Sequence, residues 1–181
     1  VWGESFKILS VLFDTKLSMF QAVQAFAAEA GWRLKTLMRT KRFYDNRTLI
    51  RLFKCHLLTY IEGATPAIYH ASASVLKPID ELQRGFLADI GISMCESLCE
   101  YSLGPLAMRR DIAMLGLLYK VSRGIAPAPI QSLFVLGRSG LDAFGFAGST
   151  AQHSYQIHDP IAPGHPVILR RSIFGLIRVW N

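Results

Sequence analysis

The sequence has few of the features that mark secreted, membrane-spanning or disulfide-stabilised proteins. Its 181 residues include three cysteines, an odd number and too few for a disulfide scaffold, which favours a reducing compartment. No basic stretch precedes an apolar one and a cleavage site, so we expect no signal peptide. No stretch approaches the roughly 20 mostly apolar residues that a membrane-spanning helix needs. We therefore expect an intracellular protein, in the nucleus or the cytoplasm, with no membrane partner.

The motifs of common enzyme classes are also missing. The sequence has no G-x-S-x-G of serine hydrolases, no H-E-x-x-H of zinc proteases, no Walker loop and no G-x-G-x-x-G dinucleotide motif. Asp14, Asp80, Asp89 and Asp111 are scattered singly, so no carboxylate pair is available for two catalytic magnesium ions. The sequence therefore predicts no catalytic residue and no cofactor in this chain.

Two groups of potential metal ligands are present, and neither has the spacing of a metal site. Cys95 and Cys99 are four residues apart, but a structural zinc site needs a second pair of ligands. We therefore expect both to be buried packing residues. His153, His158 and His165 lie in a segment rich in glycine and proline, where no regular element fixes their spacing. We predict no metal site.

The strongest pattern is a concentration of positive charge in residues 33–54, called the basic segment below. The segment has eight basic side chains against Asp45 alone, a net charge of +7 that equals that of the whole chain. The basic residues are Arg33, Lys35, Arg39, Lys41, Arg42, Arg47, Arg51 and Lys54. Such a series suits the phosphates of a nucleic-acid backbone, with affinity but no sequence specificity. A solvated basic surface is the alternative.

Part of this charge is expected on one helical face. Arg47, Arg51 and Lys54 have the spacing i, i+4 and i+7, which places them on the side of a helix away from Phe53 and Leu57. We predict that this face contacts phosphates.

The apolar periodicity predicts a mainly α-helical bundle. Residues 6–13 are short, apolar and partly β-branched, which predicts one buried strand before the helices. From Leu17 onward, apolar residues recur at spacings of three and four up to residue 136. Lys77-Pro78 predicts the start of one helix and Gly104-Pro105 that of another.

The last predicted helix and the residues after it have their own expectations. We expect the helix after Pro105 to bury Met108, Ile112, Leu115 and Tyr119. Glycines and prolines then interrupt the chain up to residue 166, which predicts an irregular tail over residues 137–181 with a short apolar element near its end.

Several short motifs follow one another in an order that is specific as a set. The first is Phe6-Lys7-Ile8-Leu9-Ser10-Val11-Leu12-Phe13-Asp14, followed by Lys16-Leu17-Ser18. The later ones are Ala67-Ile68-Tyr69, Leu82-Gln83-Arg84, Ile90-Gly91, Leu106 with Arg109-Arg110, Leu118-Tyr119-Lys120, Gly124 with Ala126-Pro127, and Val179-Trp180-Asn181. Their order resembles the region after the catalytic palm in reverse transcriptases of non-LTR (LINE-type) retrotransposons. Ser10 stands where that family usually has glycine.

The resemblance implies a location and a role. Residues 1–15 would be the end of the palm, and residues 16–136 the helical thumb and connecting region. Phe6, Ile8, Leu9, Ser10 and Val11 would belong to the strand that supports the primer end, the primer grip. The chain would then be a non-catalytic part of an RNA-directed DNA polymerase from a transposable element. Its partners would be RNA, an RNA–DNA hybrid (template–primer) and the remaining palm and fingers of the parent protein. The carboxylates that hold Mg²⁺ would lie in that palm, upstream of Val1.

Other hypotheses remain open. The chain could be a non-enzymatic helical module that binds protein or nucleic acid, or the product of a decayed transposable-element copy without function. Residues 47–61 could also form a basic amphipathic helix on an anionic membrane, which we rank last. The absence of an initiator Met and the apolar run at the end are what we expect of a piece of a longer protein.

Overall fold

The chain is mainly α-helical, with two short strands near its N-terminus, which confirms the predicted fold class. The structure is a computed structural model that describes residues 5–8, 11–136, 155–161, 164 and 166–181. The chain divides into two compact units, residues 1–110 and residues 111–181, which are described separately here.

The first unit begins with a pair of strands where the sequence predicted one. β1 (Phe6–Ile8) and β2 (Val11–Phe13) pair antiparallel, with the rings of Phe6 and Phe13 stacked 5.5 Å apart. β1 is exposed and β2 is half-buried. The prediction of a single buried strand is wrong because residues 6–13 are apolar on both faces, so their pattern carries no sign of the chain reversal.

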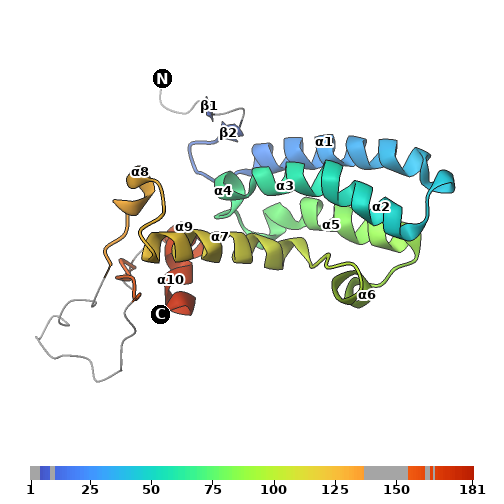
Figure 1. Ribbon diagram of the computed structural model, residues 1–181. Helices are drawn as coiled ribbons and strands as arrows, with labels where there is room; N and C mark the ends of the chain where they lie inside the picture. Colours follow the sequence, from blue (N-terminus) through green and yellow to red (C-terminus); the bar gives the residue numbers. More distant parts are fainter. Residues whose placement is uncertain (1–4, 9–10, 137–154, 162–163, 165) are drawn as a thin grey trace, which may run out of the picture. The chain divides into compact units, whose positions relative to one another are not determined.

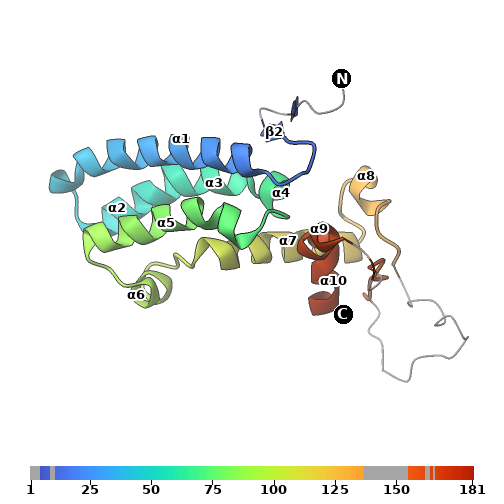
Figure 2. The same cartoon turned by 180° about the vertical axis from the view of Figure 1, so that it is seen from behind.

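Helices account for most of the described part of the first unit. Its helices are α1 (Phe20–Arg39), the 3₁₀ turn η1 (Lys41–Phe43), α2 (Asn46–Phe53), the π-helical turn η2 (Lys54–Leu58), α3 (Thr59–Gly63), α4 (Thr65–Ile68), α5 (Ala73–Ile90), α6 (Met94–Cys99) and the start of α7 (Leu106–Ser122). Figure 1 and Figure 2 show α1, the continuous α2–η2–α3 segment and α5 side by side, with α2–η2–α3 antiparallel to the other two.

Side-chain caps set where these helices begin. The carboxylate of Asp45 accepts a hydrogen bond from the Thr48 amide at 3.0 Å at the start of α2. α5 begins at Ala73, five residues before the predicted start at Pro78, because the hydroxyl of Ser72 caps it. The helix therefore accommodates Pro78 in its interior.

A stacked pair of phenylalanines lies in the core of the first unit. The rings of Phe53 on α2 and Phe86 on α5 are 4.4 Å apart and nearly parallel, and both side chains are fully buried. Phe53, Leu57 and Ile61 are all buried, as their spacing predicts, and they pack with Val23 of α1.

α7 buries a different face from the predicted one. Met108, Ile112 and Tyr119, expected in the core, are half or more exposed, and of the predicted face only Leu115 is half-buried. The buried residues are Leu106, Arg110, Met114, Leu118, Val121 and Ser122. The prediction is wrong because α7 has apolar residues on nearly all sides, and because the buried Arg110 is paired with Asp80, which hydropathy does not reveal.

The second unit includes part of the predicted tail. Its further helices are α8 (Ala128–Gln131), α9 (Val167–Arg171), the 3₁₀ turn η3 (Ile173–Leu176) and α10 (Ile177–Trp180), and its core contains Leu118, Val121, Phe134, Ile157 and Ile177. The side chain of Asn181 accepts from the amide of Ile157 at 3.0 Å and donates to its carbonyl at 2.8 Å. Residues 137–154, with His153, and His165 lie outside the described residues.

Candidate nucleic-acid interface

The elements around the α1–α2 turn (residues 40–45) position the basic segment. α1 provides Arg33, Lys35 and Arg39, and η1 provides Lys41 and Arg42. α2 provides Arg47 and Arg51, and Lys54 opens η2. In Figure 1 the turn lies at the end of α1 opposite the β1–β2 pair, so much of this charge gathers at one end of the first unit.

Arg33 interacts with two neighbouring side chains, those of Glu29 and Tyr60. Its Nε donates to Glu29 Oε1 at 2.9 Å, and its guanidinium lies 4.0 Å from the ring centre of Tyr60. Burial and the charge of Glu29 raise the pKa of Tyr60, and the charge of Arg33 opposes this rise. Arg33 therefore joins α1 to α3.

Two lysines of the basic segment donate hydrogen bonds to backbone carbonyls. Lys41 Nζ donates to the carbonyl of Asp89, and the Asn46 amide donates to the carbonyl of Ile90 at 3.2 Å. Both carbonyls lie at the C-terminal end of α5, where the helix dipole favours a cation. Lys54 Nζ donates to the carbonyl of Tyr101. These bonds fix the α1–α2 turn and the start of η2 against distant parts of the chain.

The other basic side chains point into solvent. Lys35, Arg39, Arg42, Arg47 and Arg51 are exposed, and none forms a salt bridge with a carboxylate in the part of the chain that the structure describes. They can contact a ligand without first breaking an ion pair. These five residues form the exposed part of the predicted nucleic-acid surface.

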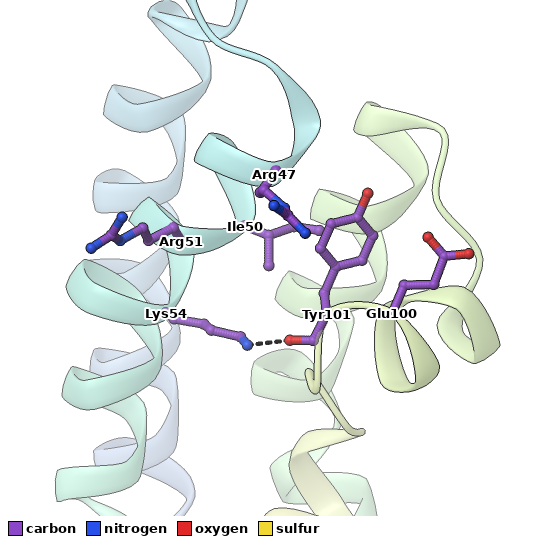
Figure 3. Close-up of a pocket in the computed structure, with 6 residues that line it drawn as sticks. All are labelled: Arg47, Ile50, Arg51, Lys54, Glu100 and Tyr101. Atoms are coloured by element: carbon purple, nitrogen blue, oxygen red, sulfur yellow. Dashed lines mark hydrogen bonds between the residues drawn. The ribbon is translucent and has the colours of Figure 1, made fainter.

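A hollow of about 230 Å³ lies beside this surface. It is lined by Arg47, Ile50, Arg51, Lys54, Glu100 and Tyr101. Figure 3 shows Arg47 beside the ring of Tyr101 and Lys54 bonded to its carbonyl, whereas Arg51 points away from Tyr101. Arg47 and Arg51 both line this hollow, as their i, i+4 spacing allows, but their side chains point in different directions in Figure 3.

The predicted primer-grip residues have different environments. Phe6 and Ile8 on β1 are exposed, whereas Val11 on β2 is half-buried and packs against the core of the first unit. Leu9 and Ser10 lie outside the described residues.

Exposed aromatic rings in the basic segment were missed at the sequence level. Phe43 is 67% exposed, Tyr44 is 46% exposed, and the Arg42 guanidinium lies 4.7 Å from the ring centre of Phe43. The signal in the sequence is Arg42-Phe43-Tyr44, two aromatic residues directly after a basic one. Asp14 was also missed, as its carboxylate accepts the amides of Ser18 and Met19 at 3.0 and 2.8 Å before α1.

The two candidate zinc ligands are exposed, so the prediction that they are buried packing residues is wrong. On the short helix α6, Ser97 is buried while Cys95 and Cys99 point outward. A hydrogen bond with Cys95, with the charges of Cys95 and Glu100, raises the pKa of the Cys99 thiol. Across the described residues, no three or more His, Cys, Asp or Glu side chains are grouped to hold a metal ion.

No helix in the described part of the chain is both long and apolar enough to cross a bilayer. No known protein family matches the chain, and no similar protein was found among curated proteins or among solved structures.

Proposed function

We propose that this chain binds nucleic acid through the phosphate backbone, as the non-catalytic thumb and connecting part of a non-LTR retrotransposon reverse transcriptase. The observation that supports this is the group of exposed cations around the α1–α2 turn: Lys35, Arg39, Arg42, Arg47 and Arg51. The helices α1 and α2 and the turn η1 carry these cations. Such an array of positive charge suits contacts with the phosphates of a nucleic-acid backbone. The order of the sequence motifs supports the assignment to a reverse transcriptase.

The geometry of α1 gives this proposal a length scale. α1 has 20 residues, which corresponds to about 30 Å at 1.5 Å per residue. On a B-form duplex, which has one phosphate of each strand every 3.4 Å along the axis, that length corresponds to about nine base pairs. With the β1–β2 pair beside the primer end, as the resemblance implies, the α1–α2 turn would meet phosphates almost one helical turn away.

The mechanism is positional. The thumb holds an RNA–DNA hybrid through its backbone, and the primer end stays aligned with Mg²⁺ held by carboxylates in the palm of the parent protein. Because binding releases condensed counterions, affinity falls steeply as salt rises and depends little on sequence.

The test is the salt dependence of hybrid binding by the full chain. Fluorescence anisotropy with a labelled blunt RNA–DNA hybrid at several salt concentrations gives the slope of log K against log salt. In the double variant Arg47→Gln/Arg51→Gln, the slope should fall in magnitude by about 1.8, which is about 0.9 for each lost phosphate contact. Lys54 is left intact because its ammonium bonds to the Tyr101 carbonyl.

A matched control removes the same charge elsewhere in the first unit. Lys77 and Arg84 are exposed and seven residues apart on α5, outside the basic segment, and Arg84 is ion-paired with Glu81 at 2.6 Å. Lys77→Gln/Arg84→Gln should leave the slope near its original value. Equal slopes in the two double variants would mean that only net charge matters, and no binding to the hybrid at low salt would overturn the proposal.

The exposed apolar side chains of the second unit favour a second candidate, a module that binds another protein. Ile125, Leu133, Val135 and Val179 are all exposed there. Light scattering coupled to size-exclusion chromatography, with and without RNA, separates the two. Self-association that RNA leaves unchanged supports the protein-binding candidate.

A further inference from the structure

We propose that the α1–α2 turn is a stacking site for unpaired nucleobases in a single-stranded segment of nucleic acid. The proposal rests on the proposed function and adds a ligand class to it. Its basis is the juxtaposition of two exposed aromatic rings, Phe43 and Tyr44, with the cations of η1 and α2.

The turn presents its rings on a fixed backbone. The amides of Phe43 and Tyr44 donate to the carbonyls of Thr40 and Lys41 at 3.0 and 3.2 Å. The side chains of Lys41 and Asn46 bond to the carbonyls at the end of α5. Because the backbone of the turn is already fixed, binding a ligand there costs less conformational entropy.

Arg42 and Phe43 together form a surface suited to a base. The guanidinium of Arg42 lies 4.7 Å from the ring centre of Phe43, and the ring remains 67% exposed. Nucleobases stack on aromatic rings and on guanidinium planes, and this stacking tolerates any base because every base has a π-face. The pair therefore offers stacking surface and positive charge in one place.

The charge around the turn selects a polyanion. Residues 39–51 contain five basic residues and one carboxylate, that of Asp45. The Oδ1 atom of Asp45 accepts the amide of Thr48 at 3.0 Å and so caps α2. The cations can reach the phosphates that flank a stacked base.

Unpaired bases fit this surface better than a duplex does. Inside a duplex the π-faces are covered by neighbouring base pairs, so a blunt duplex exposes a face only at its two end pairs and binds mainly through the cations. A single strand exposes the faces that Phe43 and Tyr44 can cover.

The test uses the full chain and a hybrid with a single-stranded overhang that contains 2-aminopurine, whose fluorescence is quenched on stacking. In one set of substrates the overhang is RNA and in the other it is DNA, with a blunt hybrid as reference. The chain should quench the probe and bind the overhang substrate more tightly than the blunt one. Phe43→Leu and Tyr44→Leu remove the rings but keep apolar side chains.

Only the affinity for the overhang substrate should fall. Phe43→Leu should weaken binding of the overhang substrate by about fivefold or more, the lower end of the range for one stacked base, and abolish quenching. Affinity for the blunt hybrid should stay within twofold. Phe20→Leu makes the same exchange at an exposed ring at the other end of α1 and should change neither. Circular dichroism spectra that match the unaltered chain confirm that each variant is folded.

The contrary outcomes separate the two proposals. Equal loss on the overhang and blunt substrates, or no loss on the overhang, overturns the stacking site while salt-dependent binding of the blunt hybrid leaves the proposed function standing. Binding of neither substrate overturns both. Binding to phosphatidylserine vesicles that Phe43→Leu weakens, with oligonucleotide affinity unchanged, would assign the rings to a membrane surface instead.

Discussion

Arg110 at the start of α7 and Asp80 on α5 form an ion pair with two hydrogen bonds, from Nη1 to Oδ1 at 2.8 Å and from Nη2 to Oδ2 at 3.0 Å. The Arg110 residue is only 6% exposed, whereas the side chain of Asp80 is 26% exposed. The buried guanidinium therefore depends on Asp80 for its counter-charge, while Asp80 keeps some contact with water.

This difference in burial predicts unequal effects of breaking the pair. Asp80→Ala leaves a buried cation without a partner and should lower the free energy of unfolding by about 3 kcal/mol. Arg110→Met leaves a carboxylate that water can reach, and the loss should be about 1 kcal/mol. Urea unfolding followed by circular dichroism measures both. A larger loss for Arg110→Met than for Asp80→Ala would contradict the assignment.

Gln83 on α5 should contribute to stability through two buried hydrogen bonds. Its Nε2 donates to the carbonyl of Gly104 at 3.0 Å, and its Oε1 accepts the amide of Leu106 at 3.0 Å. Gln83→Leu leaves both backbone groups without this partner, and the free energy of unfolding should fall by about 2 kcal/mol. Gln24→Leu, at an exposed position on α1, is the matched control and should change it little. Equal urea midpoints for the two variants would count against this role.

Asp14 should make stability depend on pH in acid. Burial acts to raise the pKa of Asp14, but the hydrogen bonds from Ser18 and Met19 outweigh it and lower the pKa below its usual value. Because its pKa is lower in the folded state, Asp14 stabilises the fold at pH values above its unfolded pKa of about 3.9. This stabilisation is lost as the pH falls through the folded pKa. Asp14→Asn should therefore cost about 1 kcal/mol at pH 7.

The same difference should shrink below about pH 4. Urea midpoints at pH 7, 5 and 3 measure the trend for the unaltered chain and the variant. Asp89→Asn, at an exposed carboxylate on α5, is the control. A gap between the unaltered chain and Asp14→Asn that stays constant from pH 7 to pH 3 would exclude the capping role.

Cys95 should slow the reaction of Cys99 with alkylating agents. The hydrogen bond with Cys95 and its charge raise the pKa of Cys99, so less thiolate is present at a given pH. Cys95→Ala should lower that pKa and speed the alkylation of Cys99 by iodoacetamide at pH 8, as measured by mass spectrometry of the peptide. Cys55→Ala should leave the rate unchanged. An unchanged rate in Cys95→Ala would show that the two thiols do not interact.

The sequence was most informative where one local pattern determines the structure. The helix that buries Phe53, Leu57 and Ile61 follows from its spacing, and the concentration of charge around the α1–α2 turn follows from counting residues. The bond from Lys54 to the carbonyl of Tyr101 joins residues 47 positions apart, and no local pattern encodes it.

Other errors arose where residue type was a poor guide to burial. The exposed Cys95 and Cys99 lie on a helix too short for a periodicity to be visible. Arg110 is buried because Asp80 offsets its charge, and this pairing appears only in three dimensions.

The straight span of α1 between the β1–β2 pair and the α1–α2 turn makes it a lever arm. For an arm of about 30 Å, a tilt of about 5° about the strand end moves the other end by about 2.6 Å, perpendicular to the helix axis. Under the proposed function, in which α1 lies along the duplex, such a tilt would carry the cations of the α1–α2 turn toward or away from the phosphates. A small rotation near the strands would therefore tighten or loosen the proposed contact at the far end of α1.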